Sequence, residues 1–226
     1  MHSKQNISPQ SITPSMALQI LKDGNHRFIN NLKVNRNLLE QVNETKDGQT
    51  PFAAILSCMD SRTSAELIFD QGLGDVFSIR IAGNVISDNV LGSLEYATAV
   101  AGSKLIVVLG HSNCGAIKGA CDDVKMGYVT TLLDKIKPAI EMEYSTKENR
   151  NSSNPEFVQN VSKLNVLHTV QQIIKTSEII NGLVWEGKLG IVPAMYDIAN
   201  GTVTFYEDDI VMSETQKEEM KATYII

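Results

Sequence analysis

Short apolar runs alternate with helical patterns from Pro51 onward, and this alternation restricts the fold more than any other feature of the sequence. The expected strands cover residues 52–56, 76–81, 104–109, 189–195 and 202–206, and the expected helices cover residues 65–70, 89–101, 115–125 and 156–180. Continuous apolar runs of this length are typical of strands buried in a parallel sheet. The pattern predicts an α/β fold with a mainly parallel central sheet of four strands, flanked by helices.

Both ends of this pattern carry an addition. A tight Asn200–Gly201 turn joins the last two expected strands and favours an antiparallel edge strand. At the other end, residues 1–12 are polar and are expected to be flexible. Thr13 and Pro14 are typical of a helix start, and apolar residues follow at helical spacing up to Leu32. We expect residues 13–50 to form a helical arm that packs on the body or on a second subunit, within one domain spanning residues 1–226.

Composition excludes several classes of protein. The net charge of −6 and the absence of a basic stretch interleaved with aromatic residues argue against nucleic-acid binding. No window approaches the roughly 20 apolar residues that cross a membrane, and the first thirty residues hold no apolar leader segment. Three cysteines, an odd number, do not suggest a secreted disulfide framework. We therefore expect a cytoplasmic protein.

Two short segments carry residues with metal-binding chemistry. Cys58-Met-Asp60-Ser-Arg62 follows the first expected strand directly, and His111-Ser-Asn-Cys114-Gly follows the third. The carboxyl ends of strands in an open parallel sheet are where such sheets bind ligands. Two thiolates and one imidazole suit tetrahedral zinc, and three protein ligands leave one position open, as in catalytic zinc sites. Taken alone, each cysteine is as well explained by core packing, and this is the role we expect for Cys121.

These segments and others resemble the β-carbonic anhydrase family. The resemblance runs from about Ala17 to Tyr206 and is carried by CMDSR at 58–62, RIAGN at 80–84, LEYA at 94–97, GHSNCG at 110–115 and YDIANGTV at 196–203. It implies a lyase that reversibly hydrates carbon dioxide to bicarbonate and a proton, through attack by zinc-bound hydroxide.

The resemblance also implies a role for individual residues. Cys58, His111 and Cys114 match the zinc ligands, with one Zn²⁺ per chain. Asp60 and Arg62 match a catalytic pair in which the arginine holds the carboxylate off the metal.

Five further residues match the family's substrate pocket. Gly115 matches a backbone donor to substrate, Phe77 and Tyr96 match an apolar wall, and Ala82 lies where a larger aliphatic residue is frequent. Gln49 matches a glutamine contributed across the dimer interface, so the resemblance implies a homodimer or a dimer of dimers.

One departure from a subset of the family is informative. Members with an inhibitory bicarbonate site carry tryptophan three residues before the first cysteine ligand and glycine one residue before it. This chain has Ile55 and Ser57 there, and its only tryptophan is Trp185. We expect the open, non-inhibited type.

Three other functions are compatible with the same residues. A relative of this family could hydrolyse carbonyl sulfide or carbon disulfide on the same fold with the same metal. A metal-free enzyme could use Cys114 as nucleophile with His111 as base. A zinc protein without catalytic activity is the third, although it would need a fourth permanent ligand. His2, His26 and His168 lack such a context, and we expect them to be surface or helix-face residues.

Overall fold

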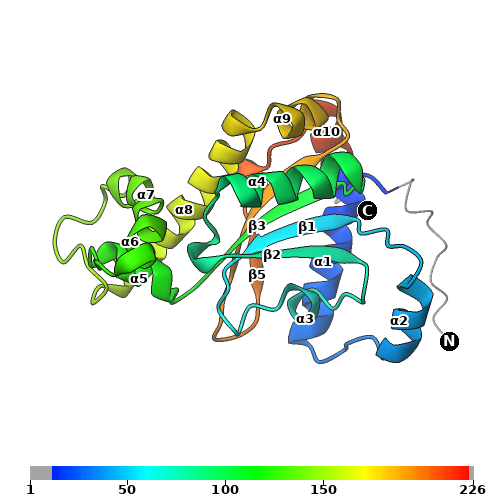
Figure 1. Ribbon diagram of the computed structural model, residues 1–226, viewed down its shortest axis with the longest axis horizontal. Helices are drawn as coiled ribbons and strands as arrows, with labels where there is room; N and C mark the ends of the chain where they lie inside the picture. Colours follow the sequence, from blue (N-terminus) through cyan, green and yellow to red (C-terminus); the bar gives the residue numbers. More distant parts are fainter. Residues whose placement is uncertain (1–11, 224–226) are drawn as a thin grey trace.

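The computed structural model describes residues 12–223, and its centre is a twisted sheet of five strands (Figure 1). The strands are β1 (Ala53–Ser57), β2 (Val76–Arg80), β3 (Leu105–His111), β4 (Gly190–Tyr196) and β5 (Val203–Phe205). Their order is β2-β1-β3-β4-β5, with the first four parallel and β5 antiparallel to β4. The predicted fold class is confirmed, including the antiparallel edge strand.

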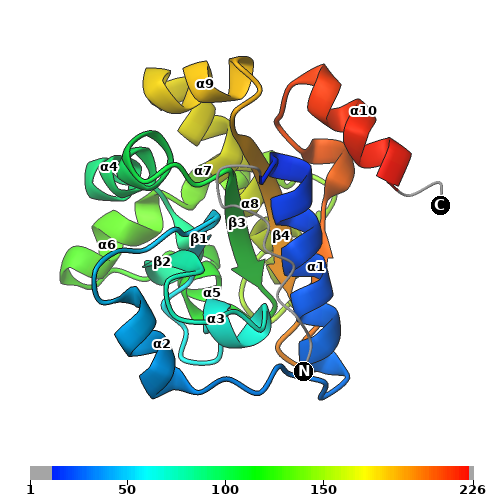
Figure 2. The same ribbon diagram turned by 90° about the vertical axis from the view of Figure 1, so that its right-hand side faces the viewer.

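Helices cover both faces of this sheet (Figure 2). They are α1 (Pro14–Ile29), α2 (Leu38–Thr45), α3 (Ala65–Ile68), α4 (Asp88–Glu95), α5 (Gly115–Cys121), α6 (Gly127–Asp134), α7 (Lys137–Met142), α8 (Pro155–Thr176), α9 (Glu178–Trp185) and α10 (Glu214–Thr223). Buried residues of α1 and α3 pack on one face, and those of α4, α8 and α9 pack on the other. Helices α5, α6 and α7 form a third apolar cluster with the start of α8, beyond the carboxyl ends of the strands.

The connections that follow β1 and β2 run over opposite faces of the sheet. Helix α3 connects β1 to β2 on one face, whereas α4 connects β2 to β3 on the other. Because β1 lies between β2 and β3, the crossovers change face between β1 and β3. Open α/β sheets bind ligands at such a topological switch point.

The amino-terminal helix packs on the body of the molecule, one of the two predicted placements, but it is shorter than predicted. Helix α1 has the predicted start, because the Thr13 side chain accepts a hydrogen bond from the backbone N–H of Met16. It ends at Ile29, so Leu32 lies outside it and is exposed. Leu18 and Leu21 are fully buried against the sheet, which makes α1 part of the core, whereas α2 has no buried residue. The expected flexibility of residues 1–11 falls outside the described residues.

The predicted helix over 156–180 is wrong at its end. It divides at Ser177, whose hydroxyl caps α9 by accepting from the backbone N–H of Ile180 and donates to Glu95. Helices α6, α7 and α10 were not predicted, and α2 falls within the predicted helical arm but was not predicted as a separate helix. No helix within residues 12–223 is both long and apolar enough to cross a membrane.

A buried carboxylate anchors the link between α1 and α2. Asp70 accepts hydrogen bonds from Arg27 Nε at 2.6 Å, from Arg36 Nη1 at 2.5 Å and from the backbone N–H of Val34 at 3.2 Å. Its side chain is only 2% exposed. Burial raises the pKa of this carboxyl, but the two arginines outweigh burial and hold the pKa below its usual range.

Replacing Asp70 with asparagine should lower the free energy of unfolding by roughly 2–3 kcal/mol at pH 7, because two guanidinium groups lose a buried charged acceptor. The folded-state pKa lies below the unfolded value of about 3.9, so the contribution is present above about pH 4 and is lost as the pH falls. Urea unfolding at pH 7 and at pH 3 measures both effects. The exposed Asp134, paired with Lys137 at 2.8 Å, supplies the control Asp134→Asn, which should change little. Equal losses in the two variants would contradict the role of Asp70.

Candidate metal centre

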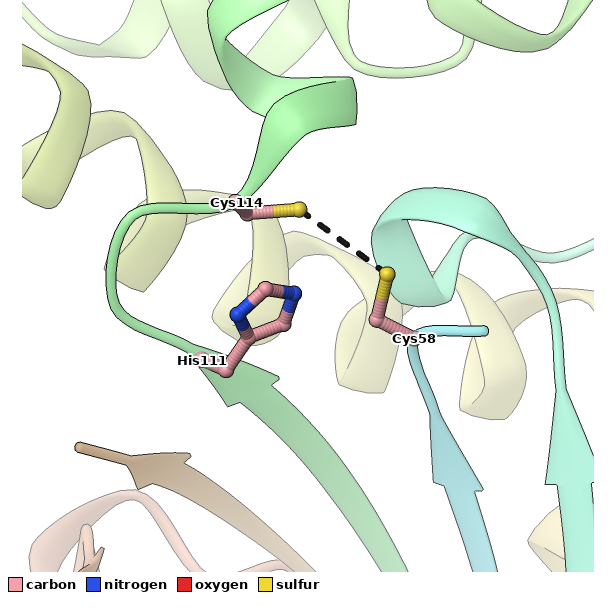
Figure 3. A group of neighbouring side chains, drawn as sticks. All are labelled: Cys58, His111 and Cys114. Atoms are coloured by element: carbon pink, nitrogen blue, oxygen red, sulfur yellow. Dashed lines mark hydrogen bonds between the residues drawn. The ribbon is translucent and has the colours of Figure 1, made fainter. Parts of the chain in front are cut away.

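The structure brings the three predicted ligands together at the switch point. Cys58 directly follows β1, His111 ends β3, and Cys114 precedes α5 as its N-cap residue (Figure 3). One ligand atom from each residue lies within 4.8 Å of the other two, and the two sulfurs are 3.9 Å apart. All three side chains are buried. The separation is suited to a single shared ion.

The chemistry of the three side chains fits a divalent cation. The hydrogen bond from Cys114 lowers the pKa of Cys58, and the same contact, with burial, raises the pKa of Cys114. The two sulfurs therefore share one hydrogen bond, with Cys58 the more acidic partner. A divalent cation between them would favour the thiolate form of both. His111 Nδ1 lies 2.9 Å from the carbonyl oxygen of Ser112, which fixes the Nδ1–H tautomer and leaves Nε2 with a free lone pair. That Nε2 is buried with no hydrogen-bond partner among the described residues.

Asp60 and Arg62 form an ion pair at the entrance to this group. Arg62 Nε lies 2.8 Å from Asp60 Oδ1, and Arg62 Nη2 lies 2.7 Å from Oδ2. The side-chain hydrogen bonds from Arg62 hold the pKa of Asp60 well below its usual range, so this carboxyl stays ionised. Asp60 Oδ2 also lies 4.0 Å from His111 Nε2. The carboxylate is therefore beside the group but turned toward the arginine.

Two residues that the sequence analysis missed fix the loop between Cys58 and Arg62. Thr63 Oγ1 lies 2.9 Å from the carbonyl oxygen of Cys58 and 2.8 Å from that of Asp60. Arg80 donates to the same two carbonyls, from Nε at 3.3 Å and from Nη2 at 2.6 Å. The available signal was positional, since Arg80 ends the strand adjacent to β1 and Thr63 directly follows the motif.

The predicted substrate residues occupy several places around this group. Phe77 and Tyr96 meet edge to face, with ring centroids 6.4 Å apart. They line a cavity of about 520 Å³ between β2 and α4, which is not lined by the three predicted ligands. Ala82 is half-buried in a short turn next to Cys58, and Gly115 is exposed at the first turn of α5.

Gln49 lies at the other end of the sheet. It is exposed in the segment between α2 and the amino end of β1, whereas Cys58 follows the carboxyl end. A strand of five residues spans about 17 Å. Gln49 is therefore out of reach of the ligands in its own chain.

Cys121, His26 and His168 take no part in the group. Cys121 is half-buried against the cluster formed by α5 to α8, and burial raises its pKa to about 11, which suits packing rather than reactivity. His26 is exposed on α1 and His168 is half-buried on α8, whereas His2 lies outside the described residues.

The structure is that of an α/β protein with two cysteines and one histidine, a group that could hold a metal ion, at the carboxyl edge of its sheet. Comparison with known proteins makes the class specific. Residues 53–203 match the family model described as carbonic anhydrase. A carbonic anhydrase of Mycolicibacterium smegmatis is 36% identical over 197 residues, which cover 84% of this chain and 92% of that protein.

Solved structures agree with this match. The structure of the β-carbonic anhydrase CcaA is 28% identical, with a TM-score of 0.66 over 84% of this chain and 87% of that one. A β-carbonic anhydrase of Sordaria macrospora, described as tetrameric, is 27% identical, with a TM-score of 0.64 over 74% of this chain and 89% of that one. The chain belongs to the β-class carbonic anhydrase family, and it is a lyase that interconverts carbon dioxide and bicarbonate.

Removing the arginine contacts to the ligand loop should weaken metal binding. Arg80→Met keeps the length of the side chain but loses both hydrogen bonds, and we expect about 10-fold lower zinc affinity, as for other residues that support metal ligands. Chelator competition measures this affinity. Arg150→Met is the matched control, because Arg150 donates to the carbonyls of Ile140 and Thr146 at 2.7 and 2.9 Å, outside the ligand loop. The same affinity in both variants would show that Arg80 does not support the site.

Proposed function

We propose that this enzyme hydrates carbon dioxide with one zinc ion per chain, held by Cys58, His111 and Cys114. The observation that carries the proposal is the buried, unpartnered Nε2 of His111, within 4.8 Å of two cysteine sulfurs. If position 111 served only to pack the core, an apolar residue would be more stable there, because a buried polar atom without a hydrogen-bond partner is costly. Zinc with three protein ligands lowers the pKa of a bound water to about 7, which supplies a nucleophile near neutral pH.

In this proposal Asp60 orients the nucleophile and Arg62 controls Asp60. An ionised carboxylate can only accept hydrogen bonds, so Asp60 would accept one from the attacking oxygen and direct its lone pair at the carbon of carbon dioxide. The two hydrogen bonds from Arg62, at 2.7 and 2.8 Å, keep Asp60 from turning toward the ligands. Ile55 and Ser57 before the first ligand support the open, non-inhibited type.

The substrate pocket we propose is shared between subunits. Gly115 and Ala82 lie beside the ligands, so they would contact substrate within one chain. Gln49 lies at the opposite end of β1, and the cavity of Phe77 and Tyr96 opens beside β2, the free parallel edge of the sheet. A second chain placed against this edge would let these residues face its metal centre.

This arrangement requires at least a homodimer. A dimer of dimers is the larger assembly that we include, and the relative from Sordaria macrospora is described as tetrameric. We keep residues 1–226 as one domain. A cytoplasmic location is part of the proposal, because a reducing compartment keeps the thiols free to bind metal.

Metal analysis of the purified chain should give one zinc per subunit. His111→Ala should reduce this to a small fraction and lower the melting temperature, because metal binding and folding are linked. His168→Ala, on α8, is the control and should retain the metal. A metal-free wild type with full activity would instead support Cys114 as a nucleophile. Carbonyl sulfide and carbon disulfide in the same assay test the other hydrolase activities.

Arg62→Ala should retain zinc but lose turnover. Without its partner, Asp60 is free to turn onto the metal, and misplacement of this kind costs about 100-fold in rate. Arg62→Lys, which keeps the charge but not the two-pronged contact, should lie between this variant and the wild type. Zinc content and carbon dioxide hydration are measured on the same samples. Loss of zinc in Arg62→Ala would contradict the assigned role.

A further inference from the structure

A short turn after β2 brings a backbone donor to one of the proposed ligands. The N–H of Gly83 points at Cys58 Sγ, with nitrogen and sulfur 3.4 Å apart. Gly83 has φ +68°, in the left-handed region that favours glycine, and a Cβ there would lie 2.9 Å from Cδ1 of Ile136. The turn is thus held in a conformation that directs its N–H at the sulfur.

One side chain from a distant helix fixes this turn. Asn165 of α8 donates from Nδ2 to the carbonyl oxygen of Gly83 at 2.8 Å, across 82 positions of sequence. Its side chain is buried, with the residue 1% exposed. Thr169, one helical turn further along α8, reaches the next carbonyl, that of Asn84, at 3.5 Å. Asn165 makes the shorter of the two contacts with the turn.

Packing alone does not account for an amide at this position. The buried neighbours of Asn165 on α8 include Val161, Val166 and Val170, and the two buried polar neighbours, Ser162 and Thr169, each donate a hydrogen bond to a carbonyl oxygen. Asn165 Oδ1 is buried and has no hydrogen-bond partner in the part of the chain that the structure describes. An unpartnered buried acceptor is unfavourable, so an apolar residue would be the better choice for stability. The amide at position 165 is therefore explained by the hydrogen bond that its Nδ2 donates to the Gly83 carbonyl.

We propose that Asn165 is a positioning residue for the metal centre, which acts by holding the Gly83 turn so that its N–H donates to Cys58 Sγ. This inference rests on the proposed role of Cys58 as a ligand. A hydrogen bond to a thiolate withdraws electron density from sulfur and reduces its donation to the metal. Residues that support ligands in this way change both the affinity and the electronic properties of a metal site.

Cobalt(II) replacing zinc in the full-length protein provides a direct readout, because the energy of the sulfur-to-cobalt charge-transfer band depends on the electron density at sulfur. Asn165→Ala should free the turn and weaken the hydrogen bond. We expect the band to move to longer wavelength, because the sulfur regains electron density, and the affinity for cobalt, measured by chelator competition, to fall by about 10- to 100-fold, because the freed turn no longer holds the ligand loop in place. Asn165→Ser, a milder change that leaves a polar side chain, should shift both in the same direction.

Ser162→Ala is the matched control. Ser162 is also buried on α8, but its hydroxyl donates to Val158 of its own helix, so its loss should leave the band and the affinity unchanged. A band at the wild-type position in both Asn165 variants, with only lower melting temperature, would overturn the inference and leave Asn165 a packing residue. Absence of a sulfur-to-cobalt band in the wild type would overturn the metal site and the inference together.

Discussion

The parallel pairing of β1 with β3 is the interaction on which the rest of the site depends. In their register Ser57 lies opposite Leu109, so Cys58 leaves the end of β1 at the level of Gly110, one residue before His111 at the end of β3. Every residue of both strands is buried, so burial of apolar surface on both faces fixes this register. A slip by one residue would turn the Cys58 side chain to the opposite face. The stability of the sheet and the geometry of the metal centre therefore have the same cause.

The site has a dry interior and a wet entrance, and its residues divide accordingly. The ligand side chains are almost fully buried, whereas the side chains of Asp60 and Arg62 are 18% and 50% exposed. Electrostatic interactions are stronger where water is excluded, which favours cation binding by the thiolates in the interior. At the entrance, solvent water reaches the Asp60–Arg62 pair and weakens its electrostatic attraction. In the proposed mechanism, metal retention and turnover therefore depend on different residues.

Apolar runs were sufficient to predict the sheet, and strand-end motifs were sufficient to single out three side chains that the structure brings together, because both signals are local in sequence. The missed helices lacked such a signal: α2 buries no residue, and α6 buries only Leu133. The capping serine at 177 was a local signal for the end of α8 that the helical pattern obscured. The role of Asn165 could not be predicted, since one asparagine on a long helix is ordinary, and only the folded structure places it against Gly83. Contacts between distant segments depend on the tertiary arrangement, which periodicity does not encode.

Three of the residues with positive φ lie beside the proposed ligands. Gly83 and Asn84, in the turn that donates to Cys58, have φ of +68° and +44°, and Asn113, directly before Cys114, has φ of +57°. Asparagine tolerates this left-handed region better than most residues, but it is still less favourable there than in a helix or strand. Each turn reverses the chain within a few residues and directs a ligand or a donor back toward the sheet. Strain of this kind persists only where surrounding contacts hold it. The hydrogen bonds that hold these turns, from Asn165 of α8 to the Gly83 carbonyl and from the Ser112 N–H to the Tyr196 carbonyl in β4, therefore support the proposed metal centre as well as the scaffold.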